Sequence, residues 1–259
     1  MREANAIAAI AYRDLMKLLR DPTRMVSTFI FPFIFIAVLG GSMQASLGRA
    51  VGYNVLIVTF TGILAQTLFQ STATGIISLI EDRESDFSQE IFVSPISRFS
   101  IIIGKIVGEA LVALPQGLAI VVFGILLGVP FSLTGILALL PVAAIVCLFG
   151  GAFGVLVLGN LNSQRAANQI FPFVMLPQFF TAGVFIPATG LPLYLEVLSR
   201  ISPLRYAVDF MRGIYYAGRP DYESVVLESP QTNLAVLAAG FVVFLAVGTV
   251  LFVRRERNR

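Results

Sequence analysis

Long apolar runs are the feature that most constrains this chain. A helix needs about 20 mainly apolar residues to cross the hydrocarbon core of a bilayer, and six stretches reach or approach that length. We expect membrane spans at residues 26–43, 53–80, 100–127, 131–158, 168–187 and 234–253. The first and fifth are short and contain prolines, which membrane helices tolerate as kinks. The sequence therefore predicts an all-α integral membrane protein with six transmembrane helices.

The composition excludes several other classes of protein. Of the 259 residues, 57% are hydrophobic and 13% are charged, whereas soluble domains carry about 25% charged residues. The slight excess of Lys and Arg (18) over Asp and Glu (15), with no basic run among stacking aromatics, argues against nucleic-acid binding. The chain has no histidine, which removes Ser–His nucleophile pairs and His zinc sites. Cys147 is the only cysteine, so no intrachain disulfide can form. We expect no catalytic residues, no metal site and no enzymatic activity.

The distribution of basic residues predicts the orientation. With the N-terminus inside, thirteen Lys and Arg residues lie in cytoplasmic flanks and loops and five lie outside, as the positive-inside rule requires. An even number of spans then returns the C-terminus to the cytoplasmic side. The sequence predicts one multi-pass domain over residues 1–259 in a cytoplasmic membrane, with both termini in the cytoplasm.

The first twenty residues are not predicted to be a secretory signal, because Arg13, Asp14 and Lys17 interrupt the region where a continuous apolar core would be needed. The predicted interfacial segment covers residues 1–24. Ile7 and Ile10 instead belong to a series of apolar residues near helical spacing. This pattern predicts an amphipathic helix lying in the membrane interface. A simple positively charged anchor is the alternative.

A polar segment, residues 81–98, separates the second and third spans. Phe87 and Ile91 are four residues apart and share one helical face, while Glu84 and Glu90 supply a polar side. Pro95 ends the helix because the residue before proline is pushed out of the α region. Such a helix suits a groove on a partner protein, although a surface turn folded back onto the spans remains an alternative.

This segment resembles the cytoplasmic loop of ABC-2 type transporter permeases, including the daunorubicin-resistance group. These are the membrane subunits of ATP-driven exporters of bacterial or archaeal inner membranes. The resemblance implies a coupling helix that docks on a cytoplasmic ATPase subunit. Asp86 departs from the pattern, since the family commonly has glycine there. The residues expected to take part in coupling are Glu81, Arg83, Glu84, Phe87, Glu90, Ile91, Pro95 and Arg98.

The segment between the last two spans, residues 187–232, resembles the external portion of the same family, which implies a re-entrant helical hairpin over the exit side. Glu196 with Arg200, and Arg205 with Asp209, are spaced for pairing on short helices. The resemblance also implies a partnership with two ATPase subunits, which carry the ATP and Mg²⁺, and with a second copy of this chain or a related permease. The hairpin residues singled out are Pro187, Pro203, Tyr206, Asp209 and Arg212.

No phosphate-binding loop is present, because Gly104-Lys105 is followed by Ile106 and position 99 is Phe99. The energy must come from another subunit or from an ion gradient. A gradient-driven carrier or channel is the alternative function, but Glu109 is the only acidic residue well inside a predicted span, and it can pair with Lys105. A membrane scaffold or sensor ranks last.

A polar stripe on the second span, with a weaker one on the fifth, predicts a translocation path at a dimer interface. Hydrogen bonding between helices is an equal alternative. The apolar character of the path favours an amphipathic drug-like or lipid-like substrate. A polysaccharide or glycolipid is the alternative, against which the shortage of aromatics in the second span argues. The path residues are Thr59, Gln66, Phe69, Gln70, Thr74, Phe173, Gln178 and Phe179.

Overall fold

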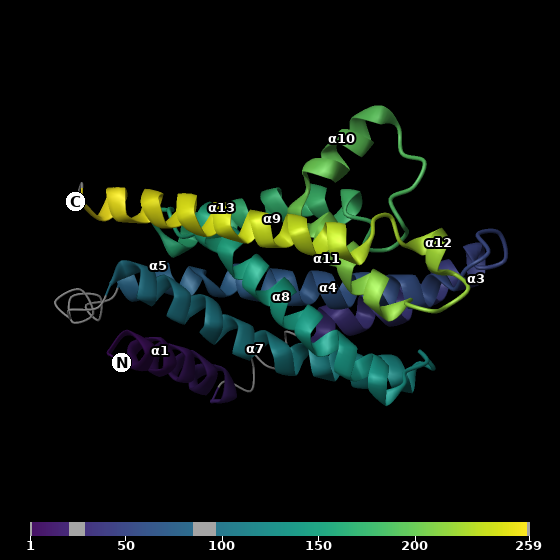
Figure 1. Ribbon diagram of the computed structural model, residues 1–259, viewed down its shortest axis with the longest axis horizontal. Coiled ribbons are helices and arrows are strands. Elements are labelled where there is room, and N and C mark those ends of the chain that lie inside the picture. The colour runs from purple at the N-terminus through teal and green to yellow at the C-terminus, as the bar shows by residue number, and fades with distance from the viewer. Residues whose placement is uncertain (1, 21–28, 85–96, 258–259) are drawn as a thin grey trace.

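The computed structural model describes residues 2–20, 29–84 and 97–257, and every regular element within them is helical. Figure 1 shows a long bundle with α1 along one flank and α10 projecting from the side. In chain order the elements are α1 (Arg2–Leu19), the π-helical η1 (Phe35–Gly40), α3 (Gly41–Leu47), α4 (Val55–Gly75), α5 (Ile77–Glu84), α7 (Arg98–Leu126), α8 (Leu133–Val157), α9 (Gln164–Thr181), α10 (Leu193–Ile201), α11 (Pro203–Tyr215), α12 (Tyr222–Val225) and α13 (Pro230–Arg257).

Side-chain caps fix the starts of four long helices. Asn54, Ser97, Ser132 and Ser163 each accept a hydrogen bond from the backbone N–H three residues later, at the starts of α4, α7, α8 and α9. Each cap satisfies a donor that has no partner inside its helix. The polar residue before each apolar run therefore defines where the helix begins.

Five stretches of the described chain are helical, long enough and apolar enough to cross a membrane. They confirm the first, second, third, fourth and sixth predicted spans as apolar helices of spanning length. The second continues through a short break at Ile76 from α4 into α5, and the last includes α12. The five are Phe29–Leu47, Val55–Asp82, Arg98–Leu126, Leu133–Val157 and Tyr222–Arg254.

The fifth predicted span differs from the others. Its helix, α9, has 18 residues, which gives a length of about 27 Å against a hydrocarbon core of about 30 Å. Polar residues such as Gln164 and Asn168 at its start lower its hydropathy. The helix nevertheless begins beside α5, where Glu84 accepts a hydrogen bond from the Gln164 N–H, and ends beside α11, where Gln178 accepts one from the Leu204 N–H. The six-span count stays a prediction that depends on α9.

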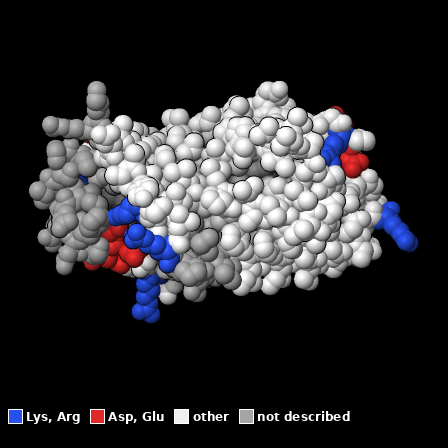
Figure 2. Space-filling view, turned by 90° about the horizontal axis from the view of Figure 1, so that it is seen from below, with Lys and Arg blue, Asp and Glu red and all other residues white. Residues whose placement is uncertain are grey.

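The two termini of the described chain lie at the same end of the bundle, together with the end of α5 (Figure 1). The α3 and α12 helices lie at the opposite end. On the face shown in Figure 2, charged side chains gather at the two ends of the body and the broad zone between them is uncharged. This distribution matches a body whose middle lies in hydrocarbon.

Helix α4 is the centre of the packing, and most of its side chains are buried. Small residues on α8 allow the two helices to meet closely. A Cβ atom at Gly150 would lie 2.4 Å from the Phe69 carbonyl oxygen, and one at Gly154 would lie 2.5 Å from that of Ala73. Because lipid is as apolar as the side chains, this close packing, rather than removal of apolar surface from water, holds the helices together.

Candidate functional site

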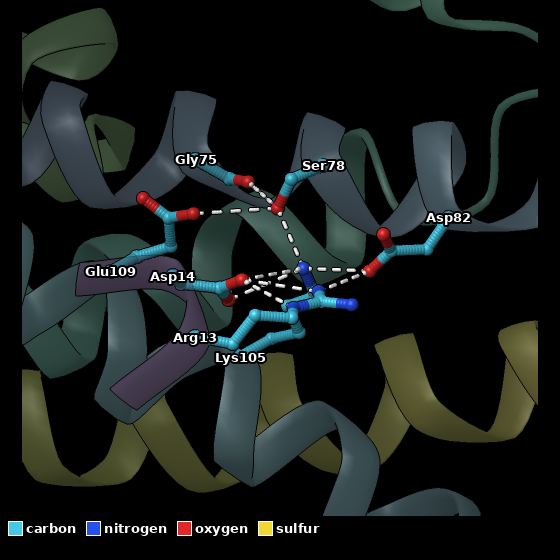
Figure 3. Close-up of polar contacts among 7 residues, drawn as sticks. All are labelled: Arg13, Asp14, Gly75, Ser78, Asp82, Lys105 and Glu109. Atoms are coloured by element: carbon cyan, nitrogen blue, oxygen red, sulfur yellow. Dashed lines mark hydrogen bonds and ion pairs between the residues drawn. The ribbon is translucent and has the colours of Figure 1, made fainter. Parts of the chain in front are cut away.

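A buried network of charged side chains joins three segments at the end of the bundle that carries the termini (Figure 3). Its centre is Lys105 on α7, whose side chain is 1% exposed. The Lys105 Nζ atom lies 2.8 Å from Asp82 Oδ2 at the end of the second span and 3.2 Å from Asp14 Oδ2 on α1. Arg13 on α1 donates to the same Asp82 oxygen at 2.7 Å and to Asp14 Oδ1 at 3.1 Å.

Ser78 extends the network toward the middle of the bundle. It accepts a hydrogen bond from Lys105 Nζ at 3.0 Å, and its hydroxyl lies 2.6 Å from the Gly75 carbonyl oxygen and 3.3 Å from Glu109 Oε1. Lys105 and Glu109, expected to pair within one helix, both contact Ser78 and belong to a network across three segments. Asp14 and Asp82 each lie within ion-pair distance of both Arg13 and Lys105, so these buried carboxylates have opposite charges close by, as burial requires.

Close packing of α1 on α7 makes the network possible. A Cβ atom at Gly108 would lie 3.0 Å from the Ala11 Cα atom and 3.2 Å from Asp14 Oδ2. Glycine therefore lets the α1 backbone come near enough for Asp14 to reach Lys105. The structure confirms a helix, α1, at the start of residues 1–24, and its position in the membrane interface stays a prediction. The sequence did not reveal that Asp14 is buried against α7, whereas Glu3 and Lys17 are exposed.

The described parts of residues 81–98, the segment predicted to couple to an ATPase, connect its two ends to different helices. At one end, the exposed Glu84 accepts a hydrogen bond at 3.1 Å from the N–H of Gln164, the first residue of α9. At the other end, Ser97 donates its N–H to Glu3 on α1 at 3.3 Å, just before Arg98 begins α7. Glu81 and Arg83 lie on α5, and Glu81 is exposed. Phe87, Glu90, Ile91 and Pro95 lie outside the described residues.

The polar stripe predicted on the second span exists, but most of its side chains bond within the protein. Gln66 donates its amide to Gln70, and Thr74 donates its hydroxyl to the Gln70 carbonyl oxygen. Thr59 donates to the Phe185 carbonyl oxygen at 3.2 Å. Gln70 is half-buried and borders a groove, so it is the residue of the stripe that reaches an open space.

This groove has a volume of about 440 Å³ and lies between the first span, α4 and α9. Five of its ten lining residues are phenylalanines, and Gln70 supplies an amide. The sequence argument against a polysaccharide relied on the shortage of aromatics in the second span, and the groove removes that argument because its aromatics come from other segments. The lining residues are Phe31, Phe35, Leu39, Gln70, Pro172, Met175, Leu176, Phe179, Phe180 and Phe185.

The other predicted path residues lie elsewhere. Phe69 is fully buried between Phe149 and Phe153, with ring centroids 5.8 and 5.2 Å away, so it belongs to the α4–α8 core. Phe173 is 81% exposed on the outer face of α9. Gln178 donates to the Val174 carbonyl oxygen at 3.1 Å and accepts from the Leu204 N–H, which makes it a link between α9 and α11. Of the eight residues, the groove includes Gln70 and Phe179.

The segment after α9 forms two helices with different environments. Glu196 and Arg200 on α10 make the predicted ion pair at 2.7 Å on the exposed surface. The predicted pair of Arg205 with Asp209 is wrong. Arg205 donates to Ser199 at 2.9 Å, whereas Asp209 accepts hydrogen bonds from the Leu227 and Glu228 N–H groups, each at 2.8 Å, and from the Asn233 side chain at 2.7 Å.

Helix α11 is largely buried against α4, α8 and α13. The re-entrant position of this segment in the membrane stays a prediction. Pro203 occupies its first position, where the missing N–H costs nothing. Tyr206 donates its hydroxyl to the Arg200 carbonyl oxygen at 2.9 Å and so links α11 back to α10. Pro187, in the loop before α10, accepts a hydrogen bond from the Thr189 N–H at 2.8 Å.

Arg212 on α11 is fully buried and donates to the Gly183 carbonyl oxygen at 2.8 Å and to that of Val58 at 3.4 Å. Burial lowers the pKa of its guanidinium, against the opposing effect of the nearby Asp209 charge. These contacts connect α11 to α4 and to the turn after α9. Arg212 therefore links three segments by hydrogen bonds, at the end of the bundle opposite the ion network.

A multi-pass helical membrane protein with an open groove along its side and a charged network at one end has the parts expected of the membrane subunit of a transporter. The comparison with known proteins agrees, because residues 5–216 match the model of the ABC-2 type transporter family. The chain belongs to this family and is a membrane component of an ABC transporter. Permeases of this kind generally work with cytoplasmic ABC ATPase subunits.

Individual relatives are distant in sequence. The chain is 25% identical to a putative transport permease, ycf38, of Cyanophora paradoxa, over 93% of this chain and 85% of that protein. It is 24% identical to a probable doxorubicin resistance ABC transporter permease protein, DrrC, of Mycobacterium tuberculosis, over 94% of this chain and 86% of that protein. A probable multidrug ABC transporter permease, YbhR, of Escherichia coli is 31% identical over 54% of this chain and 38% of its own length.

Proposed function

We propose that this chain is the permease subunit of an ATP-driven exporter that moves an amphipathic drug-like or lipid-like molecule outward. The observation that carries the proposal is the ion network. It ties α1, the end of the second span and the start of the third to the segment that the family resemblance assigns to ATPase docking. A movement of that segment would pull on all three elements together.

The same arrangement and the positive-inside rule together support the proposed orientation. Both termini lie at the end that carries the network (Figure 1), and the count of Lys and Arg assigns this end to the cytoplasm. The ATPase subunits would then contact residues 81–98, and α10 to α12 would cover the exit side. Phe87→Asp should abolish co-purification with the ATPase subunit, because it places a charge on the apolar docking face. Undiminished co-purification and ATPase stimulation would refute the docking assignment.

The groove is the proposed entrance to the path. Its volume lies within the range of about 300–1,000 Å³ typical of small-molecule sites, and an apolar wall with one amide suits an amphipath better than a charged solute. The names of the relatives from Mycobacterium tuberculosis and Escherichia coli, doxorubicin resistance and multidrug transport, favour the same substrate class. The polysaccharide alternative would require a continuous wide channel formed with a second subunit.

Transport into inside-out vesicles that contain this chain and its ATPase partner tests the proposal. ATP should drive uptake of a fluorescent amphipath, and Gln70→Leu should reduce uptake several-fold while ATPase association persists. Gln116→Leu is the matched control, since Gln116 is a buried amide on α7 that does not line the groove. Normal uptake by the Gln70→Leu variant would exclude this path. Uptake that does not depend on ATP but stops when ion gradients are dissipated would favour the gradient-driven alternative.

A second copy of the chain is the proposed partner in the membrane. The outer face of α9 carries Phe173, Leu176 and Phe180, which are 81%, 62% and 70% exposed and recur at spacings of three and four residues. In a Cys147→Ser background, Phe173→Cys should form a disulfide-linked dimer in membranes. Leu118→Cys, on the exposed face of α7, should not. Cross-linking at Leu118 but not at Phe173 would move the interface away from α9.

A further inference from the structure

A pocket of about 270 Å³ lies at the end of the bundle opposite the termini. It forms where the loop before α8 meets the chain that leaves α11, and its wall combines polar and apolar groups. Neither the groove nor the ion network includes any of its residues. The residues that matter here are Phe131, Ser132, Thr134, Ala138, Ile214 and Arg219.

Arg219 supplies a positive charge that is held in place. Its Nη2 atom donates to the Pro130 carbonyl oxygen at 2.9 Å, and its guanidinium carbon lies 4.3 Å from the centroid of the Tyr215 ring. The Tyr215 hydroxyl donates to the same carbonyl oxygen at 2.9 Å, which fixes the ring. Among the residues that the structure describes, no carboxylate lies within ion-pair distance of Arg219. Within the described part of the chain, the pocket therefore has a cation that pairs with no carboxylate.

Two hydroxyl groups complete the polar part of the wall. The Ser132 and Thr134 oxygens lie 3.0 Å apart, and both side chains are exposed. Ser132 also accepts the Gly135 N–H at 3.0 Å, so the protein itself already caps the start of α8. A guanidinium with two hydroxyls matches a singly charged group that has several acceptor oxygens, such as a phosphate diester. Phe131, Ala138 and Ile214 add apolar surface that a simple inorganic ion would leave unused.

The position of the pocket relates this chemistry to the membrane. The fourth span begins at Leu133, so Ser132 and Thr134 lie at the boundary between the apolar span and water, where lipid phosphates reside. Leu133, Leu137 and Leu140 follow along α8 at spacings of four and three, and they are 75%, 56% and 50% exposed. We propose that this pocket binds the phosphate of an anionic phospholipid whose acyl chains lie along these leucines. The bound lipid bridges α8 and α11.

Native mass spectrometry of the full-length protein in detergent tests this proposal, with phosphatidylglycerol as the probe. Arg219→Gln should weaken binding of the first lipid by about tenfold or more, because it removes a charge-assisted hydrogen bond to the phosphate. Ala138→Phe should weaken binding similarly because it fills the pocket without altering Arg219. Arg49→Gln removes an exposed arginine two residues after α3, a helix that lies at the end of the bundle opposite the termini (Figure 1), and this variant should bind as the wild type does.

Two comparisons separate the sources of the phosphate. Phosphatidylcholine and inorganic phosphate should each compete poorly with phosphatidylglycerol. Equal competition by inorganic phosphate would overturn the lipid assignment, and equal binding of phosphatidylcholine would overturn selection for negative charge. Wild-type affinity in both Arg219→Gln and Ala138→Phe, with unchanged melting temperatures, would overturn the site itself.

Discussion

Replacing Lys105 by methionine tests whether the ion network holds together the end of the bundle that carries the termini. Methionine keeps the length of the side chain but removes the charge, and the Lys105 side chain is 1% exposed. Asp14 and Asp82, with side chains 4% and 10% exposed, would lose their shared cation. Arg13, which is 26% exposed, would remain as a counter-charge at the edge.

The expected loss of stability is large for one side chain. Removing one member of a buried ion pair costs about 3–5 kcal/mol, because the remaining charge is left without compensation. For a chain of this size, 1 kcal/mol corresponds to roughly 2–4 °C in melting temperature, so the midpoint should fall by roughly 6–20 °C. In proteoliposomes, stimulation of the ATPase subunit by substrate should also be lost, because α1 is released from α7.

A matched control separates burial from the mere loss of a charge. Arg200→Met breaks the ion pair with Glu196 on α10, where the side chains are 65% and 39% exposed. Such surface pairs contribute about 0–1 kcal/mol. Thermal unfolding in detergent should therefore show a large shift for Lys105→Met and almost none for Arg200→Met. Similar small shifts in both variants would refute the argument that the network is a buried structural and coupling element.

Two further predictions concern the packing and the end of the bundle opposite the network. Gly150→Ala should lower the melting temperature by several degrees, because its Cβ atom would lie 2.4 Å from the Phe69 carbonyl oxygen. Gly41→Ala, whose Cβ atom would have no atom within 4 Å, should leave the melting temperature unchanged. Equal effects of the two substitutions would contradict the close approach of α4 and α8. Asp209→Asn should cost about 1–3 kcal/mol, because the carboxylate accepts three N–H donors and an amide NH₂ would face one of them. Hydrogen exchange should then speed up at residues 226–233, and unchanged protection there would contradict this role for Asp209.

Local rules in the sequence predicted the elements and missed the contacts between them. Apolar length identified five spans, and the Glu196–Arg200 pair formed because both residues stay exposed on one short helix. Arg205 and Asp209 have the same spacing, which shows only that they can meet. Asp209 instead accepts hydrogen bonds from the backbone N–H groups of Leu227 and Glu228, just ahead of α13.

The ion network could not be predicted from spacing, since Asp14 and Lys105 are 91 positions apart. The signal that was available is the presence of Lys105 and Glu109 inside an apolar run, because a charged residue in a span demands a partner. The sequence does not say which segment supplies that partner. Asp14 became available only because the glycines of α7 let α1 approach.

Helix α9 shows how geometry adds to a hydropathy argument. Five crossings would leave the termini at opposite ends of the bundle, yet both lie at the same end (Figure 1). The polar start of α9 lowers its hydropathy where the helix meets Glu84 on α5, and its apolar part begins further along. A short apolar section with a polar first turn fits a membrane span that starts at the level of the charged network. We therefore keep the prediction of six spans in total, in which α9 is the fifth along the chain.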